Sequence, residues 1–140
     1  MSTIAVPTPP RDLTGSGTWS TAPAGTAADN PPAAPPGYWN AKNGPPAWMQ
    51  IAFNPHPVTI TSVSATVQQT PDGITDHQVL VTLEDDSEQQ LDRWQGRTVN
   101  GQVLISDHSL APVANVKALK INTISTPSWV AWQSVQVSGY

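Results

Sequence analysis

Six residues in the second half of the sequence have side chains suited to recognising a polar ligand. Carboxylate, imidazole, guanidinium and amide groups can each hydrogen bond to hydroxyl groups, and an indole ring can stack on the C–H face of a sugar. Most of them fall near segments rich in turn-forming residues, where binding groups are commonly found. The candidate ligand-binding residues are Asp76, His77, Trp94, Arg97, Asn100 and Trp129.

Each candidate also has a structural interpretation. Trp129 follows Thr-Pro-Ser and can simply begin a core strand. Arg97, together with Arg93, can offset the acidic segment at 84–88. The Asp76-His77 pair can close a turn. The sequence leaves both interpretations open for these residues.

The same residues do not form a catalytic arrangement. The histidines His56, His77 and His108 are not at metal-ligand spacing from one another. Asp76 and His77 resemble a base and its orienting partner, but adjacent residues of an extended segment point to opposite sides. A glycine-rich phosphate loop and a nucleophile elbow are both absent from the sequence. We therefore predict a protein that is not an enzyme.

Composition excludes several other classes. The 140 residues suit one domain, and only 11% are charged, against about 25% in typical proteins. The net charge of -4 provides no basic surface for nucleic acid, and cysteine is absent, which excludes disulfides and thiolate sites. Apolar runs stay well short of the roughly 18 residues that a membrane span needs, so we expect no membrane insertion. The N-terminus does not have the pattern of a signal peptide.

Short alternating segments separated by turn residues predict an all-β fold. We expect an antiparallel β-sandwich of about eight strands, formed by residues 14–140 after a Pro-rich arm at 1–13. In 58–68 the apolar phase slips between Ile60 and Val63, as at a β-bulge. The candidate strands are 48–53, 58–68, 77–84, 89–95, 102–107, 115–124 and 129–137.

Alternation also predicts which side chains face the core. Val79, Val81 and Leu83 share one face, whereas Trp132 falls on the face opposite Val135 and Val137. One of Trp129 and Trp132 is therefore expected to point away from the core. The long connection at 23–47 is rich in Pro, Ala and Gly, and we expect Tyr38 and Trp39 to pin it to the domain.

The order of several motifs resembles the discoidin, or coagulation factor V/VIII C-type, family of galactose-binding-like domains. The motifs are AADN at 27–30, YW at 38–39, PAWMQIAF at 46–53, VKALKI at 116–121 and WVAWQSVQVSG at 129–139. The resemblance covers roughly residues 14 to 140 and implies a jelly-roll β-sandwich that binds at the end opposite the chain termini, through loops between strands.

Many members of that family hold a structural calcium ion with an early Asp and a late acidic residue. Here Asp29 matches the early Asp, but Ser134 occupies the position of the late acidic residue. Calcium prefers several hard oxygen ligands, commonly carboxylates. We therefore expect either no cofactor or a weakly held Ca²⁺, with Asp29 as the remaining side-chain ligand.

The residues and the resemblance together predict a non-catalytic, lectin-like module that recognises a neutral or galactose-type glycan. An extracellular or cell-surface location follows from such a partner, and weak single-site binding favours a homo-oligomer. Two alternatives use the same sandwich. One is a protein-interaction domain, and the other is a structural accessory domain of a larger assembly.

Overall fold

The computed structural model describes residues 10–13, 46–54, 56–69, 71–127 and 130–140, and the backbone of 18–22 and 39–40. In these ranges the chain forms strands and no helix, and thus no helix long and apolar enough to cross a membrane. Tyr38, Asp29 and Trp129 lie outside the described residues. The strands are β1 (Arg11–Asp12), β2 (Thr18–Ala22), β3 (Trp39–Asn40), β4 (Ala47–Ala52), β5 (Val58–Val67), β6 (Gly73–Leu83), β7 (Glu88–Thr98), β8 (Val103–Asp107), β9 (Val113–Ser125) and β10 (Ala131–Gly139).

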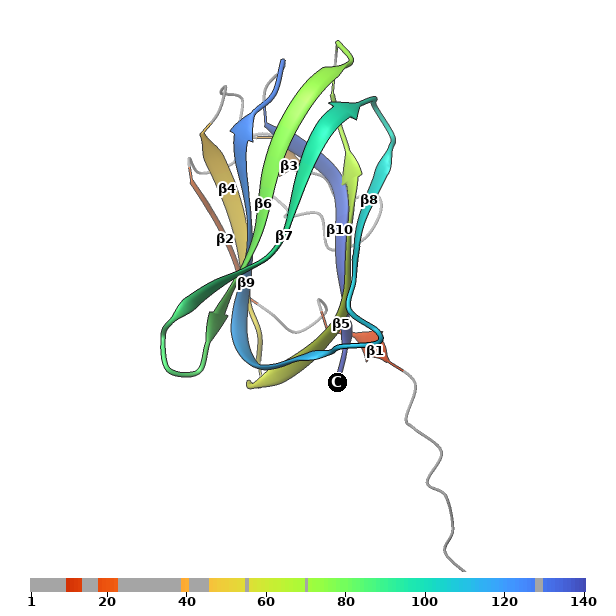
Figure 1. Cartoon of the computed structure of the whole chain (residues 1–140). Coiled ribbons are helices and arrows are strands. Elements are labelled where there is room, and N and C mark those ends of the chain that lie inside the picture. The colour runs from red at the N-terminus through yellow and green to blue at the C-terminus, as the bar shows by residue number, and fades with distance from the viewer. Residues whose placement is uncertain are drawn as a thin grey trace, which may run out of the picture.

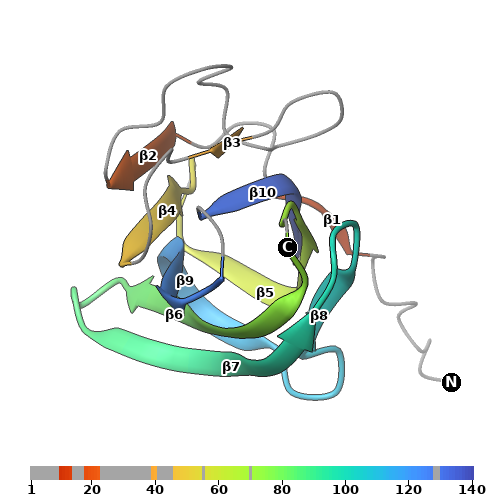
Figure 2. The ribbon, with the colours of Figure 1, turned by 90° about the horizontal axis from the view of Figure 1, so that it is seen from above.

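The strands form one antiparallel sheet that folds over into two layers (Figure 1). One layer has the order β2-β4-β9-β6-β7, and the other contains β1 and β3 on β10, followed by β5 and β8. The start of β9 pairs with the start of β5 and joins the layers. Seen from above, the strands surround a common interior (Figure 2). The predicted all-β sandwich is confirmed.

The interior is filled by the side chains that alternation assigns to it. In β4, β5 and β6, buried and partly exposed residues alternate over most of each strand. The predicted bulge in β5 is confirmed, because Ile60 and Thr61 are both buried and the pairing with β10 shifts at this point. The largest fully buried side chains are Trp132, Met49, Ile51, Ile60, Leu119, Ile121, Val63, Val79, Val81, Val116 and Val135.

Trp132 lies on the same side as Val135, although simple alternation predicts opposite sides. Trp132 and Val135 are each only 1% exposed. The pairing of β10 with β5 shifts in register between Trp132 and Ser134, so a β-bulge inserts one extra residue there. Because of this extra residue, Trp132 and Val135, which are three positions apart, both point toward the core. The prediction that Trp132 faces away from Val135 and Val137 was wrong for this reason.

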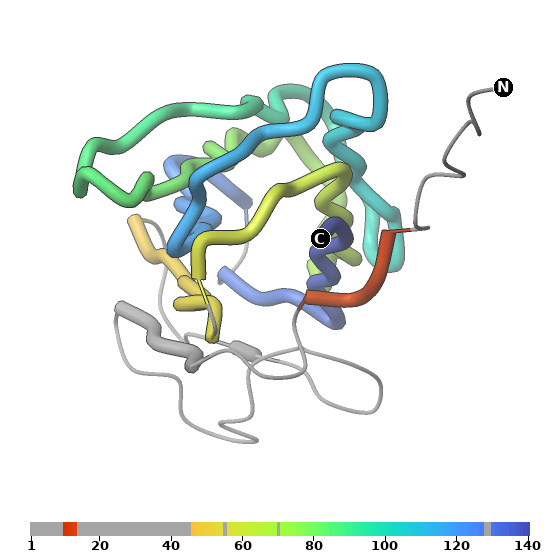
Figure 3. The backbone as a smooth tube through the Cα atoms, turned by 90° about the horizontal axis from the view of Figure 1, so that it is seen from below, coloured from red at the N-terminus to blue at the C-terminus, as the bar shows by residue number. Residues whose placement is uncertain are grey.

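The end of the segment that was expected to be an arm joins the sheet. Arg11 and Asp12 pair with Gly139 and Ser138, and the amide of Leu13 donates to the Val137 carbonyl at 2.8 Å. Leu13 is 4% exposed and belongs to the core. Figure 3 shows this segment beside the C-terminus. These residues belong to the sheet because they pair with β10, which is far away in the sequence. Local composition does not reveal such long-range pairing.

Strand direction places three connections at one end of the sandwich. β10 ends at the C-terminus, and β5 and β9 are antiparallel to β10 and β4, respectively. Residues 68–69, 99–102 and 126–127, which follow β5, β7 and β9, therefore lie at the end opposite the C-terminus (Figure 1). We refer to this end as the distal end.

Candidate functional site

A single amide ties three segments together at the distal end. Oδ1 of Asn100 accepts a hydrogen bond from the backbone N–H of Gln69 at 3.0 Å and another from Nε2 of Gln133 at 3.3 Å. These residues belong to the β5–β6 connection, the β7–β8 turn and β10. Asn100 itself is exposed. The Asn100 side chain therefore holds the loops in register, and its amide NH₂ group remains as a donor.

Buried polar side chains continue this network below the loops. The Thr98 hydroxyl donates to Oε1 of Gln69 at 2.6 Å and lies 3.0 Å from the Thr75 hydroxyl. Nε2 of Gln69 donates to the carbonyl oxygens of Pro71 and Thr98 at 3.1 and 3.2 Å. Gln69, Thr75 and Thr98 are each at most 4% exposed. Polar groups that are buried and hydrogen bonded make a region rigid, so the distal loops start from a fixed base.

Three aromatic rings pack on one another beneath this polar layer. The His77 and Trp132 ring centroids are 4.7 Å apart, and those of Trp94 and Trp132 are 6.4 Å apart in an edge-to-face arrangement. Nδ1 of His77 is hydrogen bonded to Oγ1 of Thr123 at 2.8 Å. Among the described residues, His77 Nε2, Trp94 Nε1 and Trp132 Nε1 have no hydrogen-bond partner. Ring packing, together with the bond to Thr123, therefore holds this cluster together.

His77 is a neutral interior residue. Its side chain faces the core and is 5% exposed. Burial disfavours the imidazolium and lowers the pKa of His77 to about 4, an effect that the nearby Asp76 carboxylate only partly opposes. At neutral pH the ring carries no charge, as a position between Trp132 and Thr123 requires.

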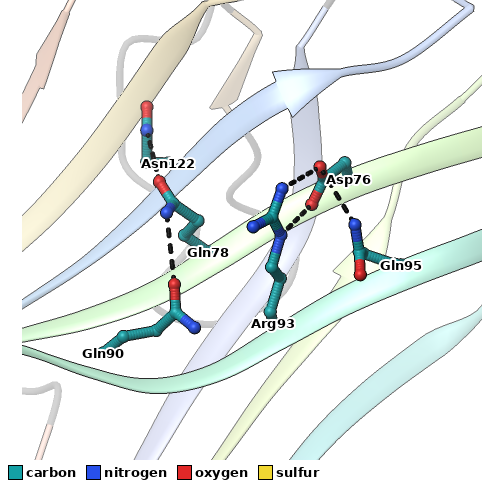
Figure 4. Close-up of polar contacts among 6 residues, drawn as sticks. All are labelled: Asp76, Gln78, Gln90, Arg93, Gln95 and Asn122. Carbon is teal, nitrogen blue, oxygen red and sulfur yellow. Dashed lines mark hydrogen bonds and ion pairs between the residues drawn. The ribbon is translucent and has the colours of Figure 1, made fainter.

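Asp76 projects to the other side of β6, onto the outer face of the sheet. Nε and Nη2 of Arg93 donate to the two carboxylate oxygens of Asp76 at 2.9 and 2.7 Å, and Nε2 of Gln95 lies 3.4 Å from Oδ2 of Asp76 (Figure 4). The hydrogen bond from Arg93 is the largest cause of a lowered pKa for Asp76. The carboxylate is thus ionised and already bound by its neighbours.

The structure distributes the described candidates over three environments. His77 and Trp94 are together in the aromatic cluster, with Trp94 only partly buried. Asp76 is on the outer face, and Arg97 is exposed on β7 opposite Ile74, near the distal end. Asn100 is in the distal turn. Asp29 and Trp129 lie outside the described residues.

Sequence reasoning missed Gln69, Thr98 and Trp132. A signal was present for part of this network, because Thr75 and His77 have the same parity as the buried Val79 in β6. Polar residues at inward-facing strand positions must find partners inside the fold, so their phase indicated an interior network. Trp132 was missed because the bulge in β10 changes the parity.

Of the two side chains that the resemblance assigns to a calcium site, the structure describes only that of Ser134. Ser134 offers a hydroxyl group where the family pattern has a carboxylate, and its Oγ lies 3.5 Å from Oγ1 of Thr66. Within the described ranges, no three His, Asp or Glu side chains gather as a metal cluster. Calcium normally requires several hard oxygen ligands. Ser134 and its neighbours therefore give no support to a tight site.

Comparison with solved structures connects this fold to sugar-binding modules. A family 32 carbohydrate-binding module of C. perfringens NanJ, solved with galactose, is 13% identical, with a TM-score of 0.72 over 92% of this chain and 98% of that one. A family 32 module of Clostridium perfringens, solved with GlcNAc-α-1,4-galactose, is 11% identical, with a TM-score of 0.70 over 96% and 97%. An F5/8 type C domain from Bacteroides fragilis is 18% identical, with a TM-score of 0.59 over 89% and 95%.

No protein-family model and no curated protein matches the sequence. The chain thus shares its fold with family 32 carbohydrate-binding modules and with an F5/8 type C domain, at low sequence identity. This likeness shows the β-sandwich fold alone.

Proposed function

We propose that this protein is a non-catalytic carbohydrate-binding module that recognises a neutral or galactose-type glycan at the distal end of the sandwich. The observation that supports this proposal most strongly is the fold. Its similarity to a module solved with galactose covers 92% of the chain. The distal end supports the proposal, because its loops rest on a rigid hydrogen-bonded base. A preformed base lowers the entropy that binding must overcome.

We assign direct sugar contacts to Arg97, Asn100 and Trp129. Arg97 and Asn100 are exposed and carry donors for sugar hydroxyls. Trp129, which falls between β9 and β10 in the sequence, would supply the stacking ring. His77 and Trp94 support this end from the interior, and Asp76 orients Arg93 on the outer face rather than contacting the sugar.

The geometry of the described residues favours binding over catalysis. His77 is neutral and buried, and Asp76 points to the opposite side of β6, so the two cannot act as a base and its orienter. A neutral ligand is favoured because the chain carries only six Lys and Arg residues against ten Asp and Glu residues. We further propose that the module acts at a cell surface or outside the cell, where such glycans are displayed.

A titration with simple galactosides, followed by a glycan array with and without EDTA, tests this proposal. We expect saturable, weak binding that Trp129→Ala and Arg97→Ala reduce without lowering the melting temperature. Ser64→Ala, on the outer face of β5, is the matched control and should bind normally. If no glycan binds and a specific protein is captured instead, the protein-interaction alternative replaces this proposal.

Copy number matters for such a weak site. A shallow sugar site buries little surface, so avidity from several copies must supply useful affinity. We propose that the module acts as a homo-oligomer or as one of several modules in a larger assembly. If analytical ultracentrifugation finds a monomer, and this monomer nevertheless agglutinates cells, the proposed homo-oligomer is contradicted.

A further inference from the structure

The outer face of the layer that contains β4, β9, β6 and β7 carries one transverse row of planar side chains. Trp48 pairs with Asn122, Asn122 with Gln78, and Gln78 with Arg93, so the four residues lie side by side on four successive strands. We call them the outer row. Neighbouring strands are about 4.8 Å apart, and three spacings give the outer row a length of roughly 14 Å.

Hydrogen bonds already organise the amides of this row. Nδ2 of Asn122 donates to Oε1 of Gln78 at 3.0 Å, and Nε2 of Gln78 donates to Oε1 of Gln90 at 3.1 Å (Figure 4). A side-chain amide has two donor hydrogens and an acceptor oxygen with two lone pairs. The chain of amides therefore keeps further donors and acceptors for a ligand, at positions fixed by the bonds between them.

Contacts with charged groups also fix the side chains at the two ends of the outer row. Nζ of Lys120 lies 5.1 Å from the ring centroid of Trp48, which is a cation–π contact on one face of the indole. At the other end, the Arg93 guanidinium forms a two-point ion pair with Asp76. Trp48, Gln78 and Asn122 are partly buried, which limits their rotamers before any ligand arrives.

The charges around the outer row cancel. Arg93 is paired with Asp76, and Lys120 lies 3.5 Å from Glu88. A surface with balanced charges gives no net attraction to a polyanion, whereas its amides suit an uncharged ligand that presents many hydroxyl groups. The other layer differs, because the outer faces of β5 and β10 carry mainly hydroxyl groups, such as those of Ser64, Thr66 and Ser138, beside the exposed amide of Gln136.

We propose that the outer row is a second carbohydrate-binding surface, separate from the distal end, that takes an extended neutral glycan chain across four strands. A row of this length matches several linked sugar units rather than one terminal sugar. The planar amides and the guanidinium supply paired hydrogen bonds to the hydroxyl groups. Trp48 supplies an apolar surface at one end of the chain.

Chemical-shift mapping on the ¹⁵N-labelled full chain tests this proposal without any substitution. The probes are linear neutral hexasaccharides of β-1,4-linked galactose, glucose and mannose, with free galactose as the comparison. At least one hexasaccharide should cause saturable shifts in β4, β9, β6 and β7 around the outer row, and free galactose should not. Shifts of the distal loops by galactose report separately on the function proposed above.

Substitutions then identify the side chains. Gln78→Ala and Trp48→Ala should each weaken the hexasaccharide that binds by about tenfold, as expected when a hydrogen bond or a packed ring is lost. Gln136→Ala, an exposed amide on β10, is the matched control and should have no effect. If Trp48→Ala does not fold, Asn122→Ala takes its place.

Three results would overturn the proposal. The first is the absence of outer-row shifts with all three hexasaccharides. The second is a set of shifts confined to the distal loops, which would leave only one binding site. The third is hexasaccharide binding that stays unchanged in both Gln78→Ala and Asn122→Ala.

Discussion

Nδ1 of His77 lies 2.8 Å from Oγ1 of Thr123, and this hydrogen bond joins β6 to β9 inside the sandwich. Burial lowers the pKa of His77 from 6.5 to about 4. Between these two pH values the unfolded chain binds more protons than the folded chain, so the free energy of unfolding falls as the pH falls. We predict a loss of roughly 3 kcal/mol across this window and no contribution from His77 above it. Urea denaturation at a series of pH values measures it.

The control for this prediction is a variant that keeps His77. His77→Gln should flatten the pH dependence between about pH 6.5 and 4, whereas Ser64→Ala, on the outer face of β5, should leave it intact. The pKa of Asp76 is lowered from 3.8, so the stability that Asp76 contributes is lost only below this window. A profile that keeps its slope in the His77 variant would contradict the assignment.

Gly139 closes the pairing between the end of β10 and the start of β5. A Cβ atom added at Gly139 would lie 1.9 Å from the Thr59 carbonyl oxygen, which is itself bonded to the Tyr140 amide at 2.9 Å. Backbone must therefore move to admit alanine. We predict that Gly139→Ala lowers the free energy of unfolding by about 1–3 kcal/mol, as overpacking does. Hydrogen exchange should also show lost protection at Thr59 and Tyr140.

Gly101→Ala is the matched comparison. Gly101 has a φ of 83° and open space around its Cα, so alanine there adds backbone strain of about 1–2 kcal/mol without a clash. Its effect should stay at the distal end and leave the protection of Thr59 unchanged. Equal exchange behaviour in both variants would show that Gly139 has no special role in the pairing.

The sequence predicted most of this fold because alternation is a local signal. The strands β4 to β10 correspond to candidate segments, and the bulge near Thr61 was visible as a slip in apolar phase. Two features could not be predicted locally. The bulge after Trp132 depends on the register with β5, and the pairing of Arg11 and Asp12 depends on β10. Both are set by residues far away in the sequence.

The candidate site was harder to predict because residue type alone does not give direction. Asp76 and His77 were both assigned to ligand contact although alternation places them on opposite sides, and the structure puts Asp76 on the outer face and His77 in the core. Asn100 was assigned to ligand contact, and the structure adds its bond to Gln69. The outer row joins four strands, and only the register between strands reveals it.

Ser134 leads to a prediction about calcium. A serine hydroxyl is a poorer calcium ligand than a carboxylate, and Oγ of Ser134 is near Thr66 instead. A tight site at a hundred times its Kd would stabilise the fold by about 2.7 kcal/mol. We predict that micromolar calcium adds less than about 1 kcal/mol and that EDTA leaves the melting temperature unchanged. A large stabilisation would mean that Asp29 and other oxygens complete a site.

Asn100 separates positioning from sugar contact at the distal end. Asn100→Ala removes the acceptor of the Gln69 N–H and of the Gln133 amide, so we predict a loss of about 1–2 kcal/mol of stability. Asn100→Asp keeps an acceptor oxygen but loses the NH₂ donor, and it should retain most of that stability. If the aspartate variant is stable yet binds galactosides weakly, the amide donates to the sugar. If it binds normally, Asn100 only positions the loops. An unchanged melting temperature in Asn100→Ala would contradict the positioning role.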